Sequence, residues 1–215
     1  MPITEIDQMR ESVAAKCREI AAREVAVGGA GNVSVRVGDQ VLITRSNLRF
    51  EAATAEDVSV VDLDGKLLEG ERPSSETGLH VGVYRRSGAE AVVHTHGRSS
   101  VAVGLVSDEI PLVHYNLLRL GGRVPTVPYF VFGSKELADA TGDAVAAGAA
   151  AVLLRNHGSV ACGRSLDEAV EHAEMTEWVC DVYLAAKSLG EPSLLTSQDL
   201  EEVAGQATRL AYGGH

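Results

Sequence analysis

The sequence predicts an α/β fold, a single domain over residues 1–215 in which a mostly antiparallel central sheet is flanked by helices. Short alternating segments, VSVRV and QVLIT, are typical of half-buried strands, and two longer apolar runs, AEAVVHTH and AAVLLRNHG, are typical of buried ones. Between them lie segments whose apolar residues recur at helical spacing. A chain of 215 residues with 45% hydrophobic residues is long enough to bury one sizeable core.

The first half of the chain predicts one helix followed by a small antiparallel meander. Met9, Val13, Cys17 and Ile20 fall on one helix face within residues 6–24, and the glycine-rich VGGAGN that follows predicts a loop. The strands VSVRV and QVLIT are joined by Gly-Asp, which is a hairpin signal. A third strand in DVSVVDLDG turns back through Asp-Gly into KLLEG, so these neighbours are expected to pair as a meander.

The second half predicts helices that alternate with the two buried strands. Ser75 is expected to cap a helix whose face carries Leu79, Val83 and Tyr84. An S-x-x-E capping box at Ser165 opens a long helix that is expected to reach residue 189. Further helices are expected at residues 99–105, 135–147 and 197–211, and residues 123–134 are expected to be largely extended.

Charge and composition exclude several classes of function. The net charge of −11 argues against a nucleic-acid-binding protein, because such binding depends on a basic surface that neutralises phosphates. A small anionic substrate is compatible with this net charge, because a few hydrogen-bond donors in a pocket can outweigh the repulsion from the protein's overall negative charge. Three widely separated cysteines predict free thiols in a reducing compartment. The sequence lacks a signal-peptide pattern and a run of eighteen apolar residues, so we expect a cytoplasmic protein without membrane contact.

Three histidines are candidates for metal ligands. His94 and His96 are two residues apart in a predicted strand, so their rings should point to the same face. His157 ends the other buried strand, and if the two strands are neighbours, three imidazoles converge. Three protein nitrogens with an open fourth position are typical of a catalytic zinc site. The alternative is three separate histidines that are satisfied by hydrogen bonds at strand ends.

Serine- and glycine-rich segments supply further candidates. Glu76 follows two serines at a predicted helix start, where a carboxylate is ordinarily stabilising by about 0.3–1 kcal/mol. The functional interpretation makes Glu76 a metal-proximal carboxylate that ligates the ion or takes a proton. Ser74 and Ser75 would then direct donors at an anion, as helix starts do. Gly31 and Asn32 form either an ordinary turn or a loop that approaches a phosphate closely.

The motifs taken together resemble a known family. The segments GNVSVR, LITRSN, SSE, VVHTH, VHYNLLRLGG, VPYFVFGSKEL and NHGSVACGRSLDEA, in this order and spacing, resemble the class II aldolase and adducin-head family, in the branch of L-fuculose-1-phosphate aldolase. The resemblance runs from about Met9 to Tyr212-Gly213. It implies a homotetramer with active sites between neighbouring subunits and one zinc ion per subunit on His94, His96 and His157, although another divalent metal is possible.

The resemblance also implies roles for single residues. Glu76 matches a carboxylate that coordinates the metal and later serves as acid and base. Tyr115 matches a proton donor that is contributed across the subunit interface, and Tyr212 matches a C-terminal tyrosine that approaches a neighbouring site. The positions that match phosphate-binding residues are Gly31, Asn32, Ser46, Asn47, Ser74 and Ser75.

One loop departs from the family pattern, which commonly reads ITPTG or ITPSG where this chain has ITRSN. Asn47 replaces glycine but tolerates a left-handed backbone better than most residues, so the loop shape is expected to survive. Arg45 either binds a phosphate or carboxylate group through its guanidinium fork or is a solvated surface charge. The substrate is therefore left open.

The predicted function is a reversible aldol cleavage. A small phosphorylated sugar, a ketose 1-phosphate, would be split to dihydroxyacetone phosphate and a short aldehyde through an enediolate that the metal stabilises. None of the lysines lies in a segment assigned to the site, which argues against a Schiff-base mechanism. Alternatives within the superfamily are a sugar-phosphate 4-epimerase, a dehydratase and a decarboxylase. A non-catalytic adducin-like module is disfavoured because all three histidines are present.

Overall fold

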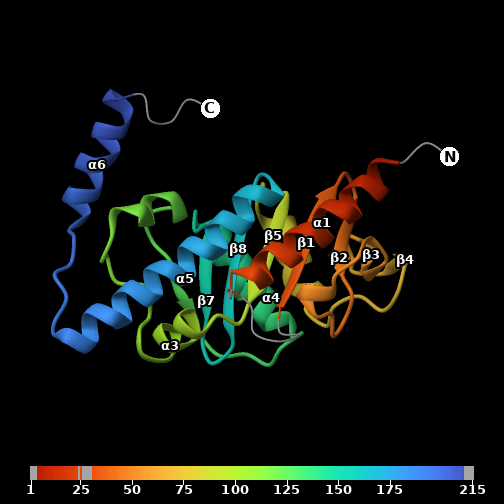
Figure 1. The fold of residues 1–215 in the computed structure, drawn as a ribbon, viewed down its shortest axis with the longest axis horizontal. Helices are drawn as coiled ribbons and strands as arrows, with labels where there is room; N and C mark the ends of the chain where they lie inside the picture. The colour runs from red at the N-terminus through yellow and green to blue at the C-terminus, as the bar shows by residue number, and fades with distance from the viewer. Residues whose placement is uncertain (1–3, 24, 26–30, 211–215) are drawn as a thin grey trace.

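The computed structural model describes residues 4–23, 25 and 31–210, and it shows one sheet between layers of helices (Figure 1). The eight strands are ordered β4-β3-β2-β1-β5-β8-β7-β6. β6 runs parallel to β7 and the other named pairs are antiparallel, so the sheet is mixed and the prediction of a mostly antiparallel sheet is confirmed. The strands are β1 (Gly31–Val37), β2 (Gln40–Thr44), β3 (Val58–Asp62), β4 (Leu67–Glu69), β5 (Ala91–Thr95), β6 (Thr126–Val127), β7 (Ala151–Leu154) and β8 (Gly158–Gly163).

Helices cover both faces of the sheet. The α-helices are α1 (Glu5–Ala22), α2 (Thr77–Arg86), α3 (Arg98–Val106), α4 (Lys135–Ala146), α5 (Leu166–Leu189) and α6 (Ser197–Arg209), and the 3-10 helices are η1 (Phe50–Ala52), η2 (Ala55–Asp57) and η3 (Tyr115–Leu120). In Figure 1, α1 and α5 cross the face of the sheet that is nearest the viewer. Together with α3 they pack on that face, whereas α2 and α4 pack on the other.

Strand alternation separates the buried side chains into two cores. Val33 and Val35 of β1 pack towards α1, in a cluster that also holds Cys17. Ile43 of β2 belongs to the opposite cluster, together with Leu79 of α2. Each fully buried aliphatic side chain of this kind contributes about 1.5–3 kcal/mol. Because aromatic residues make up only 4% of the chain, both cores depend mainly on close packing of aliphatic side chains.

Several sequence predictions are confirmed and a few are wrong in detail. The β1–β2 hairpin and the antiparallel meander through β4 are observed. Helix α2 begins at Thr77 with Glu76 as its N-cap residue, not with Ser75. The strand β8 was not predicted, because its sequence GSVACG is short and is bounded by two glycines. The run AAVLLRNHG contains strand β7 only as far as Leu154, and His157 lies in the turn that follows.

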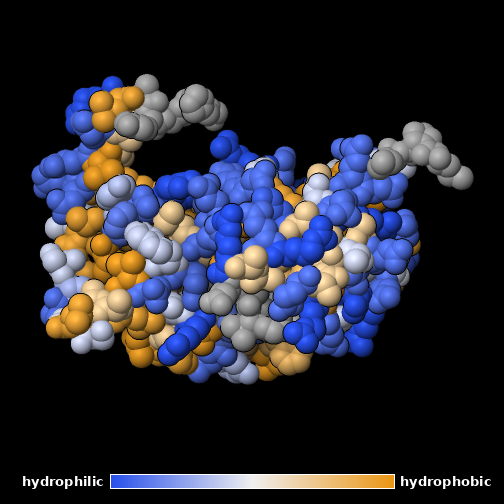
Figure 2. All heavy atoms as spheres, viewed as in Figure 1, coloured by the Kyte–Doolittle hydropathy of each residue, from blue (hydrophilic) through white to orange (hydrophobic). Residues whose placement is uncertain are grey.

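The face of the molecule seen in Figure 2 is mostly polar over the central helices and more apolar at one end. In Figure 2, apolar side chains gather near α3, the C-terminal end of α5 and the segment that leads to α6, whereas α1 is largely hydrophilic. Leu105, Val106, Leu189 and Leu194 are among the exposed apolar residues. Within the ranges that the structure describes, none of the helices combines the length and apolar character needed to cross a membrane.

Candidate metal centre and anion pocket

Three imidazole rings meet at the C-terminal end of the central strand β5, with ring centroids 4.7–4.8 Å apart. His94 is in β5, His96 directly follows this strand, and His157 is in the turn between β7 and β8. The Nε2 atoms of His94 and His96 are 2.9 Å apart, and one ligand nitrogen from each of the three rings lies within 4.8 Å of the others. The cluster therefore has the dimensions of a site for one metal ion.

The route by which the three histidines converge differs from the expected one. The strands that carry His94 and precede His157 are not neighbours, because β8 lies between β5 and β7. The tight β7–β8 turn carries His157 back to the sheet, where Ser159 pairs with Thr95 of β5. This pairing places the turn beside the end of β5, so the imidazoles meet although the premise about strand order was wrong.

The protonation of these rings fits a divalent metal ion. His94 donates from Nδ1 to the carbonyl oxygen of Ser159 at 2.9 Å, which directs its Nε2 lone pair towards the other two rings. Burial lowers the pKa of His94 well below its usual value, lowers that of His96, and lowers that of His157 to about 4. Three neutral imidazoles, one with its tautomer set by a backbone carbonyl, match the donor set of a catalytic zinc site.

Gly158 allows the turn to approach the end of β5. A Cβ atom at this position would lie 2.2 Å from the carbonyl oxygen of Thr95 and 2.9 Å from Cδ2 of His96. Both distances are shorter than any ordinary non-bonded contact, so a larger residue would push the turn away from the sheet. The absence of a side chain at Gly158 therefore helps to hold His96 and His157 together.

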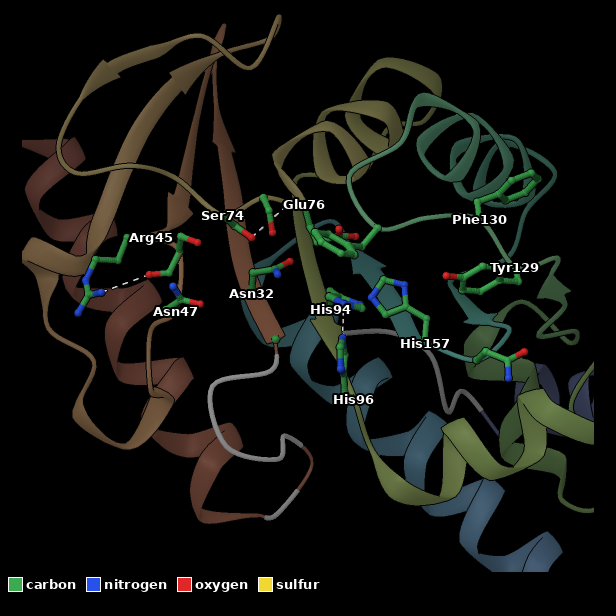
Figure 3. A pocket seen from close by; sticks show the side chains of 15 residues that line it. Asn32, Arg45, Asn47, Ser74, Glu76, His94, His96, Tyr129, Phe130 and His157 are labelled. Carbon is green, nitrogen blue, oxygen red and sulfur yellow. Dashed lines mark hydrogen bonds between the residues drawn. The ribbon is translucent and has the colours of Figure 1, made fainter.

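The histidine cluster opens into a pocket of about 290 Å³. Figure 3 shows His94, His96 and His157 on one side of it, with Asn32, Ser74 and Glu76 close by and Arg45 and Asn47 at its far side. The predicted site residues that line the pocket are Gly31, Asn32, Arg45, Ser46, Asn47, Ser74, Ser75, Glu76, His94, His96 and His157. The structure thus brings together residues from segments that are far apart in the sequence.

Gly31 and Asn32 lie in the sheet and not in a loop. They are the first residues of β1, which corrects the sequence interpretation. Gly31 pairs with Thr95 and Asn32 pairs with His94, and residues directly opposite in an antiparallel pair share a face. A Cβ atom on Gly31 would lie 2.9 Å from the backbone oxygen of His94. The side chain of Asn32 is therefore fixed next to a candidate metal ligand.

Glu76 is a buried carboxylate without a compensating partner. It is the N-cap residue of α2, its side chain does not cap the helix, and it is only 4% exposed. Neither carboxylate oxygen accepts a hydrogen bond of ordinary geometry among the described residues. Burial raises the pKa of Glu76 and outweighs the opposing effect of the nearby Gly133 N–H. An unpaired buried carboxylate is costly, so this one is placed to meet a proton, a cation or a substrate. Glu76 does not belong to the cluster of three nitrogens.

The loop at residues 45–47 is tied to the segment that carries Ser74. The Ser46 N–H donates to the Arg72 carbonyl at 3.0 Å, and the Ser74 N–H donates to the Thr44 carbonyl at 3.1 Å. Asn47 has a φ of 57°, so asparagine adopts here the left-handed backbone that glycine would supply. The expectation that the loop keeps a left-handed residue is confirmed.

Arg45 is held by carboxylates. Its Nε donates to Asp57 at 2.6 Å, and Glu71 lies 3.4 Å away. The hydrogen bond with Asp57 raises the pKa of Arg45, which remains charged. The guanidinium therefore belongs to an ion pair at the edge of the pocket, and binding of a substrate anion by Arg45 stays a prediction.

One predicted residue that the structure describes, Tyr115, does not line the pocket. Tyr115 begins η3, is 50% exposed, and stacks on His114 with ring centroids 4.4 Å apart. It does not line the pocket of its own chain. Tyr212 lies outside the described residues.

Four lining residues were not predicted: Tyr129, Phe130, Phe132 and Asn156. Tyr129 and Phe132 are 58% and 65% exposed, which is unusual for large apolar side chains. The only sequence signal was the density of aromatic residues in YFVF within a chain that is poor in them. Asn156 has a φ of 57° and directly precedes His157, so it forms part of the turn that delivers this ring.

Comparisons with known proteins agree with the fold and the site. Residues 11–184 match the family described as Class II Aldolase and Adducin N-terminal domain. The chain is 36% identical over 203 residues to a 5-deoxy-D-ribulose 1-phosphate aldolase of Bacillus thuringiensis serovar kurstaki, covering 93% of this chain and 95% of the relative. It is 34% identical over 202 residues to an L-fuculose phosphate aldolase of Escherichia coli strain K12, covering 93% of each.

A solved structure of an L-fuculose 1-phosphate aldolase superposes with a TM-score of 0.87 at 30% sequence identity, and it covers 94% of this chain and 96% of that one. The chain belongs to the class II aldolase and adducin family, as the sequence resemblance indicated. Because its near full-length relatives are aldolases, it is an enzyme of the aldehyde-lyase class.

Proposed function

We propose that this protein is a zinc-dependent aldolase that reversibly cleaves a ketose 1-phosphate to dihydroxyacetone phosphate and a short aldehyde. The observation that carries the proposal is the content of one pocket: three neutral imidazoles, an unpaired buried carboxylate, and two hydrogen-bonded loops with hydroxyl and amide groups. The relatives named as aldolases of L-fuculose phosphate and 5-deoxyribulose phosphate support a substrate of this kind.

His94, His96 and His157 would hold the metal, with Glu76 as an additional ligand before substrate binds. A zinc ion there would supply a Lewis acid that stabilises the negative charge developing on the ketone oxygen during cleavage. The neutral imidazoles leave the positive charge of the ion undiminished, and the Ser159 carbonyl keeps His94 in the required orientation.

The phosphate would lie between Asn32 and the loops that contain Ser46, Asn47, Ser74 and Ser75. These residues offer hydroxyl, amide and backbone donors without a positive side chain, because the guanidinium of Arg45 is engaged by Asp57. Such donors bind an anion by geometry, and they would fix the first carbon of the substrate relative to the histidines.

Proton transfer is the task of Glu76 and Tyr115. Cleavage breaks the bond between C3 and C4, leaves its electron pair on the C3 side, and requires the C4 hydroxyl to lose its proton. Glu76, whose pKa is raised by burial, would leave the metal, take up a proton from solvent and deliver it to C3. The C4 hydroxyl would pass its proton to the Tyr115 oxygen as Tyr115 releases its own proton to solvent, and the same transfers would run backwards in the reverse direction. Because Tyr115 lies outside the pocket of its own chain, we propose that a neighbouring subunit of a homotetramer supplies it.

Cleavage assays with a panel of ketose 1-phosphates, with and without a chelator, test the reaction. We expect activity that is lost on metal removal and restored by zinc. Activity that survives complete metal removal would refute the proposal, and interconversion of pentulose phosphates without cleavage products would instead identify an epimerase.

Mixing two inactive variants tests the shared site. Subunits carrying Tyr115→Phe and subunits carrying His94→Ala should each be inactive alone. Hybrid oligomers should regain activity, because some sites combine an intact Tyr115 with an intact His94. Failure of the hybrids to regain any activity would refute a role for Tyr115 across an interface.

A further inference from the structure

A buried chain of hydrogen bonds runs from α2 to Asn32. Ser34 Oγ lies 2.6 Å from Nδ1 of His80 and 2.6 Å from the Tyr84 hydroxyl, and Nε2 of His80 lies 2.5 Å from Oδ1 of Asn32. Ser34 and His80 are completely buried, and Asn32 and Tyr84 are 6% and 1% exposed. None of these groups except Asn32 lines the pocket.

The geometry of the two elements explains why the chain forms. Asn32 and Ser34 are two residues apart in β1, so they point to the same face and are separated by about 6.6 Å along the strand. His80 and Tyr84 are four residues apart in α2, so they share one face and are separated by about 6 Å along the helix. These similar repeats allow the two pairs to interlock where α2 packs on the sheet.

The direction of every bond follows from the Tyr84 end. Burial raises the pKa of Tyr84, so the phenol keeps its proton, and among the described residues Ser34 is the only acceptor for it. The Ser34 hydroxyl must then donate to Nδ1 of His80. Nδ1 is therefore the acceptor nitrogen and carries no hydrogen, so the ring is neutral and its hydrogen lies on Nε2, and the complete burial of the ring favours this neutral form. Nε2–H in turn requires an acceptor, which is Oδ1 of Asn32.

We infer that His80 is a positioning residue that fixes the amide of Asn32 with its oxygen towards α2 and its NH₂ group towards the pocket. A flipped amide would reverse the whole chain and leave the buried Tyr84 proton without an acceptor, which is costly. Asn32 therefore offers the pocket a hydrogen-bond donor, its NH₂ group, and a ligand must place a hydrogen-bond acceptor next to it. This inference rests on the proposed function only in naming that acceptor as the phosphate of the substrate.

The test compares two variants of equal shape. His80→Gln keeps an N–H donor near the position of Nε2, whereas His80→Met has the same length and no donor. Binding of dihydroxyacetone phosphate and of dihydroxyacetone to the zinc-loaded protein would be measured by calorimetry. Relative to wild type, we expect His80→Met to bind dihydroxyacetone phosphate about tenfold more weakly, and His80→Gln to stay within about twofold. Neither should change the zinc content or the affinity for dihydroxyacetone.

A second variant and a spectroscopic readout keep the test independent of how His80→Met folds. Ser34→Ala removes the hydroxyl that donates to Nδ1 of His80, so both tautomers of the ring and both orientations of the amide become accessible, and the affinity for dihydroxyacetone phosphate should fall about twofold. Thr176→Val, which removes a buried hydroxyl outside the chain, should have no such effect. Nitrogen-15 NMR of the wild type should show His80 protonated at Nε2.

The outcomes separate the inference from the proposed function. Protonation of His80 at Nδ1, or equal affinities of the His80→Gln and His80→Met variants for dihydroxyacetone phosphate, would overturn the inference while the aldolase assay still gives its own answer. A wild-type protein that binds dihydroxyacetone phosphate no better than dihydroxyacetone would overturn the phosphate as the acceptor, whereas the NMR measurement of the His80 tautomer would still decide the orientation of the amide.

Discussion

Acidification from pH 7 to pH 5 is expected to destabilise the protein by about 2 kcal/mol through His80 alone. The side chain is completely buried, and its pKa is lowered from 6.5 to about 3 in the folded protein. Between these two values the unfolded chain binds a proton that the folded chain does not, so the free energy of unfolding falls as the pH falls. A pH of 5 is about 1.5 units below the pKa of this histidine in the unfolded chain, and each unit of difference corresponds to about 1.4 kcal/mol.

The magnitude does not depend on the folded pKa, provided that it lies well below 5. Urea unfolding of wild type, His80→Gln and His80→Met at pH 7 and pH 5, at constant ionic strength, isolates the contribution. Both variants lack the titrating group, so each should lose about 2 kcal/mol less than wild type over this interval. Other histidines contribute equally to all three proteins and cancel in the comparison. An equal loss in wild type and variants would show that His80 is not held neutral by burial.

Further predictions concern the turn, the loop and the anion pocket. Gly158→Ala should lower the free energy of unfolding by about 1–3 kcal/mol and reduce zinc content, measured by urea unfolding and metal analysis, because its Cβ would collide with Thr95 and His96. Gly205→Ala, in open space on α6, should do neither. Asn47→Gly should leave thermal stability nearly unchanged, whereas Asn47→Val should cost about 1–2 kcal/mol because of the positive φ. Asn32→Asp, which replaces the donor by an acceptor, should raise the KM for a ketose 1-phosphate at least about tenfold with zinc content unchanged. Arg45→Ala should change stability by less than about 1 kcal/mol, since the ion pair with Asp57 is partly exposed, and a KM raised more than about tenfold would show that Arg45 binds substrate.

Local patterns were sufficient for most elements of the fold. The β1–β2 hairpin was predictable because its alternation and its Gly-Asp turn act within a dozen residues. The long helix α5 was predictable from the S-x-x-E capping box that begins at Ser165. Strand β8 was missed because a short glycine-bounded run has no periodicity of its own and is stabilised by its neighbours β5 and β7.

The sequence was sufficient to predict most residues of the candidate site, but not how the fold brings them together. The spacing of His94 and His96 indicates a shared face, but no local pattern reveals that a turn brings in His157 across an intervening strand. The role of His80 was not predictable, because its partners Asn32 and Ser34 are 48 and 46 residues away in the sequence. The aromatic residues at the pocket, Tyr129 and Phe132, resemble core residues by type, so their exposure was not readable from the sequence.

The site is built from two halves of the chain, which meet where β1 pairs with β5. The three imidazoles come from residues 94–157, whereas the proposed anion-binding groups come from residues 31–75. During folding, the metal ligands can therefore come together by closing the β5–β8 ladder before the meander of β1–β4 has docked against it. A chain caught at that stage would have its three candidate metal ligands together but would not yet have the proposed anion-binding groups beside them. Acquisition of the metal and recognition of the substrate would then be successive events in the maturation of this protein.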